Sequence, residues 1–301
     1  MKRRSLTPNE ILQLCATLQR ATLGALMASR RWERGDLAFQ GGTCLHLAHG
    51  SPRFSEDLDF MVRGGMSLVG LEKAIERLLV LPDSLPPGLK RAVTLAKDDR
   101  NPHAFIVSLG GPDYLGSAKV KVELWTTPQA AMERLQLVVQ PMTSPTGERF
   151  FLPVETLPEI LADKVYALGA RDRIKPRDIF DLWWLKNNNP SAAPTLSRDA
   201  LQLRLMIYPN GAQDEAETAA RWLEAAAKRL ERLQEENMHE LTGVVANDLS
   251  RWLPSSWGMN QADAAPMVIA SRESLAEGIA VMTDIEAQLS AHKQGAPERC
   301  R

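Results

Sequence analysis

Apolar residues follow two different spacings along the chain, and these predict strands in its first half and helices in its second. Residues 119–125, KVKVELW, alternate strictly, which predicts a strand whose two valines and leucine face the core. Residues 37–39, LAF, are apolar throughout and predict a short buried strand. After a capping box at residues 7–10, TPNE, apolar residues recur at helical spacing, so a packing helix is expected to about Arg31.

The remaining elements divide the chain into two domains, residues 1–150 and 151–301. In the first we expect helices over 43–49 and about 68–80, and strands near 57–62, 91–97 and 103–109. In the second we expect helices only, starting after a second capping box at 156–159 and continuing over 178–185, 214–236 and 273–289. The expected fold class is therefore α+β, with an N-terminal mixed sheet flanked by helices and a C-terminal all-helical domain.

Two aspartates separated by one leucine form the first candidate site. Successive side chains of a strand point to opposite faces, so Asp57 and Asp59 share one face. Neighbouring carboxylates repel unless a cation lies between them or one is protonated, and Mg²⁺ or Mn²⁺ suits such oxygen ligands. A solvated turn is the alternative interpretation of the same residues.

A glycine pair precedes these aspartates and adds a second chemistry. Gly41 and Gly42 allow the backbone to turn tightly and to approach a ligand closely. Thr43 is expected to cap the following helix, whose N-terminus would attract phosphate. Arg53, between that helix and the aspartates, is either a triphosphate contact or a solvated or structural residue.

A lysine and two aspartates form a second block near the start of the helical half. Lys164 lies in the same helical stripe as Ile160 and Leu168, where a lysine either extends to water or has a buried anionic partner. Asp178 and Asp181 stand in the first turns of the next helix, which Pro176 begins, and their presence favours the buried partner. The connection between these two helices, residues 171–177, is basic and contains Arg171, Arg173, Lys175 and Arg177. These four side chains either contact a phosphate backbone or form a solvated surface.

These two blocks carry a family resemblance. The pattern GGT-x-L-x-L-x-x-G-x-x-R-x-SEDLDF over residues 41–60 resembles the signature of the AbiEii/MenT-type nucleotidyltransferase toxins. The stretches L-A-D-K-x-x-A-L-x-x-R, residues 161–171, and R-D-I-F-D-L-W-W-L, residues 177–185, resemble the lysine and aspartate motifs of the same family. The resemblance covers residues 37–62 and 119–185 and implies a nucleotidyltransferase fold.

The resemblance also implies roles for individual residues. Asp57 and Asp59 would hold the metal, and Glu123 matches the position of a third metal carboxylate, although it also fits a charge-paired strand face. Gly41, Gly42, Thr43, Arg53 and Lys164 would bind the nucleotide, and Asp181 would act as a general base or orient Lys164. The N-terminal sheet would then hold the metal, and the helical half would close over the nucleotide.

The implied activity is transfer of a nucleotide from an NTP to RNA, with the 3′ end of tRNA as acceptor and a cognate antitoxin as partner, in toxin–antitoxin or phage defence. The alternatives are a nucleotidyltransferase acting on a small molecule such as an antibiotic, and a regulatory module that binds a nucleotide without turnover. Intact Asp57, Asp59, Lys164 and Asp181 argue against the module. Ser55 lies beside the carboxylates, where phosphorylation would repel a triphosphate.

Composition bears on the cellular location and on nucleic-acid binding, but not on the reaction. The 36 basic and 37 acidic side chains give a net charge of −1, so nucleic-acid binding requires a local basic patch. Cys15, Cys44 and Cys300 have no metal-binding spacing and suit a reducing compartment, the first two as buried residues. No signal peptide or membrane-spanning run is expected, so a soluble cytoplasmic protein is expected.

Overall fold

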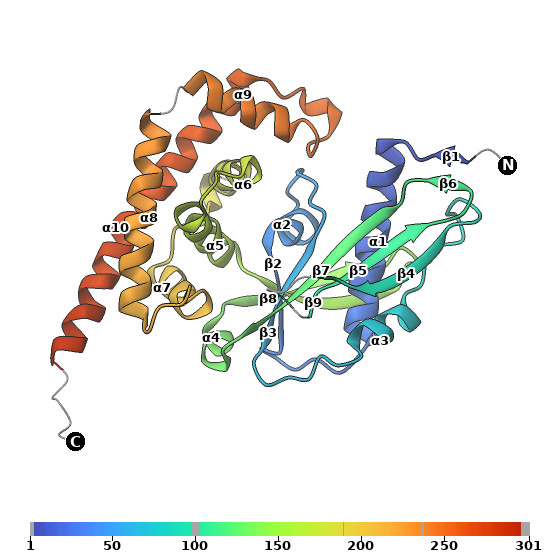
Figure 1. The fold of residues 1–301 in the computed structure, drawn as a ribbon, viewed down its shortest axis with the longest axis horizontal. Coiled ribbons are helices and arrows are strands. Elements are labelled where there is room, and N and C mark those ends of the chain that lie inside the picture. The colour runs from blue at the N-terminus through green and yellow to red at the C-terminus, as the bar shows by residue number, and fades with distance from the viewer. Residues whose placement is uncertain (1–2, 98–100, 102, 189, 236–237, 296–301) are drawn as a thin grey trace. The chain divides into compact units, whose positions relative to one another are not determined.

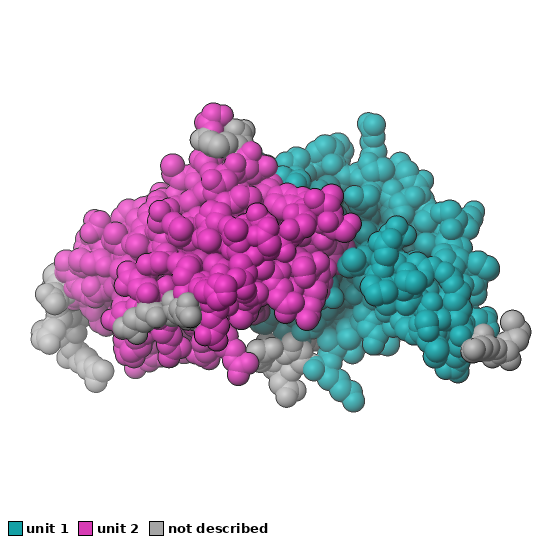
Figure 2. All heavy atoms as spheres, turned by 90° about the horizontal axis from the view of Figure 1, so that it is seen from above, with its two compact units in different colours: residues 1–50, 55–133, 137–155 teal, residues 51–54, 134–136, 156–301 magenta. Residues whose placement is uncertain are grey.

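The chain forms two compact units (Figures 1 and 2). The computed structural model describes residues 3–97, 101, 103–188, 190–235 and 238–295. Unit 1 comprises residues 1–50, 55–133 and 137–155, and unit 2 comprises residues 51–54, 134–136 and 156–301. Two short segments of the N-terminal half therefore belong to unit 2.

A seven-stranded mixed sheet forms the centre of unit 1. Its strand order is β4-β5-β7-β3-β2-β9-β8, in which β3 runs parallel to β7 and antiparallel to β2, and β2 runs parallel to β9. The strands are β2 (Leu37–Gln40), β3 (Leu58–Arg63), β4 (Lys90–Leu95), β5 (Phe105–Gly110), β7 (Ala118–Thr127), β8 (Leu137–Thr143) and β9 (Arg149–Glu155). A separate parallel pair joins β1 (Arg4–Ser5) to β6 (Tyr114–Leu115).

Four helices accompany the sheet in the described part of unit 1: α1 (Pro8–Ala28), α2 (Gly41–His49), α3 (Leu71–Leu78) and α4 (Gln129–Arg134). The capping box of α1 forms as predicted, with Thr7 and Glu10 bonded reciprocally. α1 packs against β5, β7 and β9, and α2 packs against β2, β3 and β9. All four residues of β2 are buried, so the strand that leads into the glycine pair is covered on both faces.

Among the described residues, α1 alone is long and apolar enough to cross a membrane by length and composition. No membrane-spanning run was expected from the sequence. Half of that stretch is buried inside the protein, as in the core helix of a soluble protein, and a single helix of this kind is weak evidence for a membrane span. Its packing against the sheet gives the apolar side chains a place in the core.

Unit 2 is built from helices in its described part. They are α5 (Leu157–Ala170), α6 (Pro176–Asn187), α7 (Arg198–Ile207), α8 (Glu215–Glu235), α9 (Met238–Leu249) and α10 (Gln261–Gly295), with short 3₁₀ turns at Pro190–Ala192 and Ser255–Trp257. α10 packs against α5, α6, α7, α8 and α9. The α+β class, with its N-terminal mixed sheet and C-terminal helices, is confirmed.

The approach of α5 to α8 in unit 2 depends on a glycine. A Cβ at Gly169 would stand 2.6 Å from Trp222, and the Trp222 Nε1–H donates to the Tyr166 carbonyl at 2.9 Å. Trp222 is buried on α8 beside Ala219 and Ala226. The helical stripe of α8 therefore includes a tryptophan that anchors it to α5.

Two predicted details of unit 2 are wrong. Thr156 is the N-cap of α5 but its side chain makes no cap hydrogen bond. The box fails because Glu159 instead accepts from the backbone N–H of Gln136 and from Arg204. The last helix begins at Gln261 rather than 273, with Pro266 in its first turns. Cys15 and Cys44 are buried as predicted, and Cys300 lies outside the described residues.

Candidate functional site

Gly41 lies at the junction of β2 and α2, directly against Asp59. Its φ is +79°, in the left-handed region that favours glycine. A Cβ added there would stand 3.0 Å from Asp59 Oδ2, because Gln40 pairs with Asp59 across β2 and β3. The conformation therefore favours glycine at this position, a Cβ would have to displace the Asp59 carboxylate slightly, and the backbone of the glycine pair borders that carboxylate.

Asp57 and Asp59 enter the sheet where β3 begins. Asp59 is the second residue of β3 and half-buried, between the buried Leu58 and Phe60. Asp57 directly precedes the strand and is also half-buried. The Thr43 hydroxyl donates to the Asp57 carbonyl, which fixes the backbone at this point.

That hydrogen bond corrects the predicted role of Thr43 as a helix cap. The N-cap of α2 is Gln40, which makes no side-chain cap hydrogen bond, and α2 begins at Gly41. Thr43 is fully buried in the first turn, where its hydroxyl ties α2 to the residue that leads into β3. The first turn of α2, with Gly42 as its second residue, thus carries backbone amides without a side-chain cap.

Glu123 lies on β7 in register with Asp59, so these two predicted metal residues sit opposite each other on adjacent parallel strands. Its carboxylate forms an ion pair with Lys121 on the same strand. No group of three or more His, Cys, Asp or Glu side chains suited to a metal occurs in the described parts of the chain. Mg²⁺ commonly uses one or two carboxylates and takes its other ligands from water and substrate phosphates.

In unit 2, Lys164 has the buried anionic partners that its position in an apolar stripe indicated. Its Nζ lies 2.9 Å from Asp178 Oδ1 and 2.7 Å from Asp181 Oδ2. The Lys164 side chain is 11% exposed, and those of the aspartates 7% and 0%. Arg171 forms a further ion pair with Asp178.

Arg53 belongs to the same network, because residues 51–54 are part of unit 2. Its Nε and Nη2 donate to the two oxygens of Asp181 at 2.7 and 2.8 Å, and its Nη1 donates to the Phe54 carbonyl at 3.0 Å. The backbone N–H of Phe54 donates to the Trp252 carbonyl at 2.7 Å. Both oxygens of Asp181 therefore face cations, and of the two interpretations of Arg53 this burial matches a structural residue.

Burial and charge oppose each other in this network, and charge prevails. Burial, the largest effect, lowers the pKa of Lys164, but Asp178 and Asp181 outweigh it and the pKa is raised overall. For Asp178 burial again acts first and raises the pKa, yet Lys164 and Arg171 bring it down to about 2. Both groups are therefore charged at neutral pH, as buried members of an ion network must be.

The residues of the basic connection are placed differently from one another. Arg171 pairs with Asp178, while the Arg177 guanidinium lies over the Trp252 ring at 5.0 Å. Arg173 is exposed. The pKa of Lys175 is lowered, first by the neighbouring charge of Arg171 and then by burial. The lowered pKa of Lys175 reflects a local excess of positive charge.

Ser55 and a second buried ion network lie outside the two groups of residues above. Ser55 is half-buried, and its backbone carbonyl accepts a hydrogen bond from the Gln19 side chain at 2.6 Å. In unit 2, buried Arg204 contacts Glu159 at 2.8 Å and Asp163 at 2.6 Å, a network that sequence reasoning missed. The four-residue spacing of Glu159 and Asp163 on one helix face was the available signal.

The sequence model of the family described as nucleotidyl transferase AbiEii toxin, type IV TA system, matches residues 25–248, which is more than half of the chain. The chain belongs to the AbiEii nucleotidyltransferase toxin family. It is therefore a nucleotidyltransferase toxin of a toxin–antitoxin system, with an NTP as substrate and a cognate antitoxin. None of the curated proteins compared with the chain matches it.

The chain is also similar to solved structures. MenT4, a nucleotidyltransferase toxin from Mycobacterium tuberculosis H37Rv, is 17% identical with a TM-score of 0.51, and the match covers 94% of this chain and 88% of MenT4. JHP933 from Helicobacter pylori is also 17% identical, with a TM-score of 0.47 and 94% and 97% of the two chains covered. The likeness to MenT4 supports the fold assignment.

Proposed function

We propose that this AbiEii-family protein is a Mg²⁺-dependent enzyme that transfers a nucleoside monophosphate from an NTP to RNA, with the 3′ hydroxyl of a tRNA as acceptor. It would act in the cytoplasm, where tRNA and NTPs are found. The observation that carries the proposal lies within unit 1. There the glycine at the start of α2 borders Asp59, which is in register with Glu123.

The donor set of unit 1 fits a hard divalent ion. Asp57 and Asp59 would hold Mg²⁺ or Mn²⁺, with Glu123 as the third carboxylate from the neighbouring strand. Gly41 supports this fit, because a Cβ there would fill the space in front of Asp59 Oδ2. The bound ion would offset negative charge on the phosphates and on the attacking and leaving oxygens.

The first turn of α2 supplies the complementary phosphate contacts. Backbone N–H groups at a helix N-terminus attract phosphate through their unpaired hydrogens and the helix dipole. Gly41, Gly42 and Thr43 contribute these amides. The Thr43 hydroxyl is already bonded to the Asp57 carbonyl, so its contribution is to hold Asp57 in position.

Lys164 is proposed to bind phosphate with the one N–H that the aspartates do not use. Two of its three donors point to Asp178 and Asp181, which hold the ammonium in a single place. Asp181 receives Arg53 on both oxygens, so we assign it as the residue that orients Lys164 rather than as a general base. Arg53 serves nucleotide binding through this orientation.

The proposal is tested by incubating the purified protein with each labelled NTP, Mg²⁺ and total tRNA. We expect label from at least one NTP to enter tRNA with the wild type and to be lost with Asp57→Ala. Asp83→Ala, which removes an exposed carboxylate elsewhere in unit 1, should retain transfer. Transfer that survives Asp57→Ala, or the absence of transfer to tRNA with all four NTPs, would contradict the proposal.

A further inference from the structure

A cavity in unit 2 combines three arginines with an aliphatic wall. It has a volume of about 510 Å³, within the range of ligand pockets. Its lining comes from the α5–α6 connection, α8 and α9, through Arg173, Ile174, Pro176, Arg229, Arg232, Leu241 and Val244. None of these side chains is acidic, so the cavity has a net positive lining.

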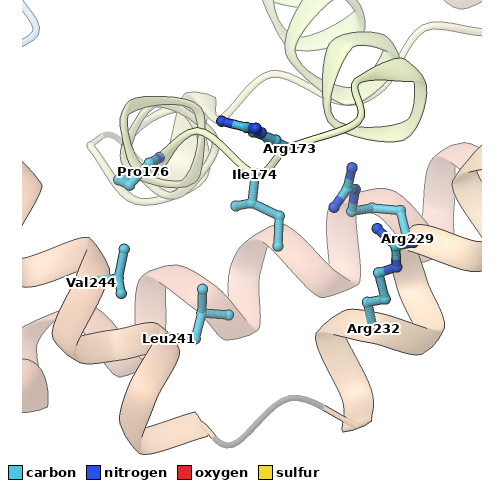
Figure 3. A pocket seen from close by; sticks show the side chains of 7 residues that line it. All are labelled: Arg173, Ile174, Pro176, Arg229, Arg232, Leu241 and Val244. Carbon is cyan, nitrogen blue, oxygen red and sulfur yellow. The ribbon is translucent and has the colours of Figure 1, made fainter.

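Two chemistries divide the wall of this cavity. Figure 3 shows Arg229 and Arg232 on one side and Leu241 and Val244 on the other, with Ile174 between them. The two α8 arginines are three residues apart and so share a helix face. A ligand that fits must present an anionic part to one side and an apolar or flat part to the other.

The arginines differ in how they are held. Arg229 is buried and donates to the Arg171 carbonyl, which fixes its guanidinium. Arg173 and Arg232 are exposed, and neither makes a hydrogen bond or ion pair to another described residue. Their donors are therefore available to a ligand, and a guanidinium binds phosphate through two parallel N–H groups.

We propose that this cavity binds one nucleotide of a single-stranded RNA segment, with its phosphate on the arginines and its base against the aliphatic wall. One nucleotide carries both chemistries that the cavity offers, an anionic phosphate and an apolar base face. Two more positive side chains, Lys175 and Arg177, follow Arg173 in the chain. Neighbouring phosphates of the same strand would need such additional positive charge beyond the cavity. The inference rests on the proposed function only in naming this RNA as the acceptor of transfer.

Binding is measured by fluorescence anisotropy with a labelled ten-residue oligouridylate, in EDTA and without NTP, so that no transfer occurs. We expect Arg173→Ala/Arg232→Ala to weaken binding about tenfold or more. The slope of log K against log salt should fall by about 0.7, because single strands lose about 0.7 per neutralised phosphate and the arginines of the cavity share one phosphate. Both residues are exposed, so folding should be retained.

The matched control removes two positive charges from the same helix outside the cavity. Arg221→Ala/Lys228→Ala alters exposed residues of α8 that pair with Glu217 and Glu224, and it should leave affinity and slope near the wild type. A second pair tests the aliphatic wall at Val244, which is 54% exposed. Val244→Glu should weaken RNA binding by charge repulsion, whereas Val244→Gln should do so much less.

Three results would overturn the inference: no loss in the cavity variant, equal loss in the control, or cavity-dependent binding of an acidic Glu-Leu peptide without RNA binding. The last result would assign the cavity to a peptide partner. The tRNA transfer assay separates this inference from the proposed function. Transfer with cavity-independent RNA binding leaves the function standing, and cavity-dependent RNA binding without transfer leaves the cavity assignment standing.

Discussion

Arg53 and Asp181 form a two-point ion pair in the interior of unit 2, at 2.7 and 2.8 Å, with side chains 2% and 0% exposed. They are 128 residues apart in the chain and belong to the two separate blocks that carry the family resemblance. Because Lys164 also contacts Asp181, the pair connects the segment that precedes Asp57 in the chain to the lysine motif. Arg53, from the glycine and aspartate block, therefore holds Asp181 of the lysine and aspartate block in place.

Replacing Arg53 should destabilise the protein strongly. Arg53→Met leaves the buried Asp181 with Lys164 as its remaining ion partner, and breaking a buried pair in this way costs about 3–5 kcal/mol. Urea denaturation followed by circular dichroism measures the change. Arg221→Met breaks the exposed pair with Glu217 and should cost less than about 1 kcal/mol. Similar losses of unfolding free energy in the two variants would show that the buried Arg53–Asp181 pair stabilises the protein no more than an exposed pair does.

Acid should weaken unit 2 through Asp178. Its pKa is about 2 in the folded protein against an ordinary 3.8, so its stabilising contribution is present above about pH 4 and is lost as the pH falls toward 2. The shift corresponds to roughly 2 kcal/mol. Urea midpoints should therefore separate wild type from Asp178→Asn at pH 7, and the separation should shrink between about pH 4 and pH 2. A separation that is constant across this range would count against the ion network.

Gly41 and Gly50 have nearly the same backbone conformation, so a comparison of their alanine variants separates the effect of backbone strain from that of contact with Asp59. Gly41 and Gly50 have φ values of +79° and +80°, but only Gly41 would bring a Cβ close to Asp59. Both alanine variants should lose about 1–2 kcal/mol from backbone strain. Nucleotide transfer should fall at least tenfold further in Gly41→Ala than in Gly50→Ala. Equal activities would remove the contact with Asp59 from the mechanism.

Glu123 distinguishes a three-carboxylate metal site from a two-carboxylate one. If it holds the ion with Asp59, Glu123→Gln should raise the Mg²⁺ concentration needed for half-maximal transfer about tenfold. Lys121→Met removes the ion partner of Glu123 and should not raise that requirement. A Mg²⁺ titration of transfer by the two variants decides between them. An unchanged requirement in Glu123→Gln would leave Glu123 as a charge-paired strand residue.

Sequence predicted best the parts of the fold that depend on short-range pattern. The buried β2, the capping box of α1 and the alternation of β7 are local signals, and each appears in the structure. β8 and β9 escaped prediction because β8 is largely exposed and lacks an alternating core face. β9 pairs with this exposed β8 and with β2, and β2 is more than a hundred residues away.

The candidate site shows the same limit. Asp178 and Asp181 beside Lys164 were predictable because a lysine in an apolar stripe either extends to water or pairs with an anion, and two aspartates follow in the next helix. The hydrogen bond from Thr43 to the Asp57 carbonyl was not, because a threonine after two glycines fits a helix cap equally well. Arg53 carried no local sign of burial, since its partner lies far along the chain.

Lys164 and Asp181 should behave as one functional unit if Asp181 orients the lysine. Lys164→Met is expected to reduce kcat/KM for the NTP about 10–100-fold, mainly through KM, because a charge-assisted phosphate contact is lost. Asp181→Asn should give a similar loss, and the double variant should be little worse than either. A general base would behave differently, with a large fall in kcat, an unchanged KM and loss of the acidic limb of the pH–rate profile. Steady-state kinetics with saturating RNA and Mg²⁺ therefore separates orientation of Lys164 from proton abstraction by Asp181.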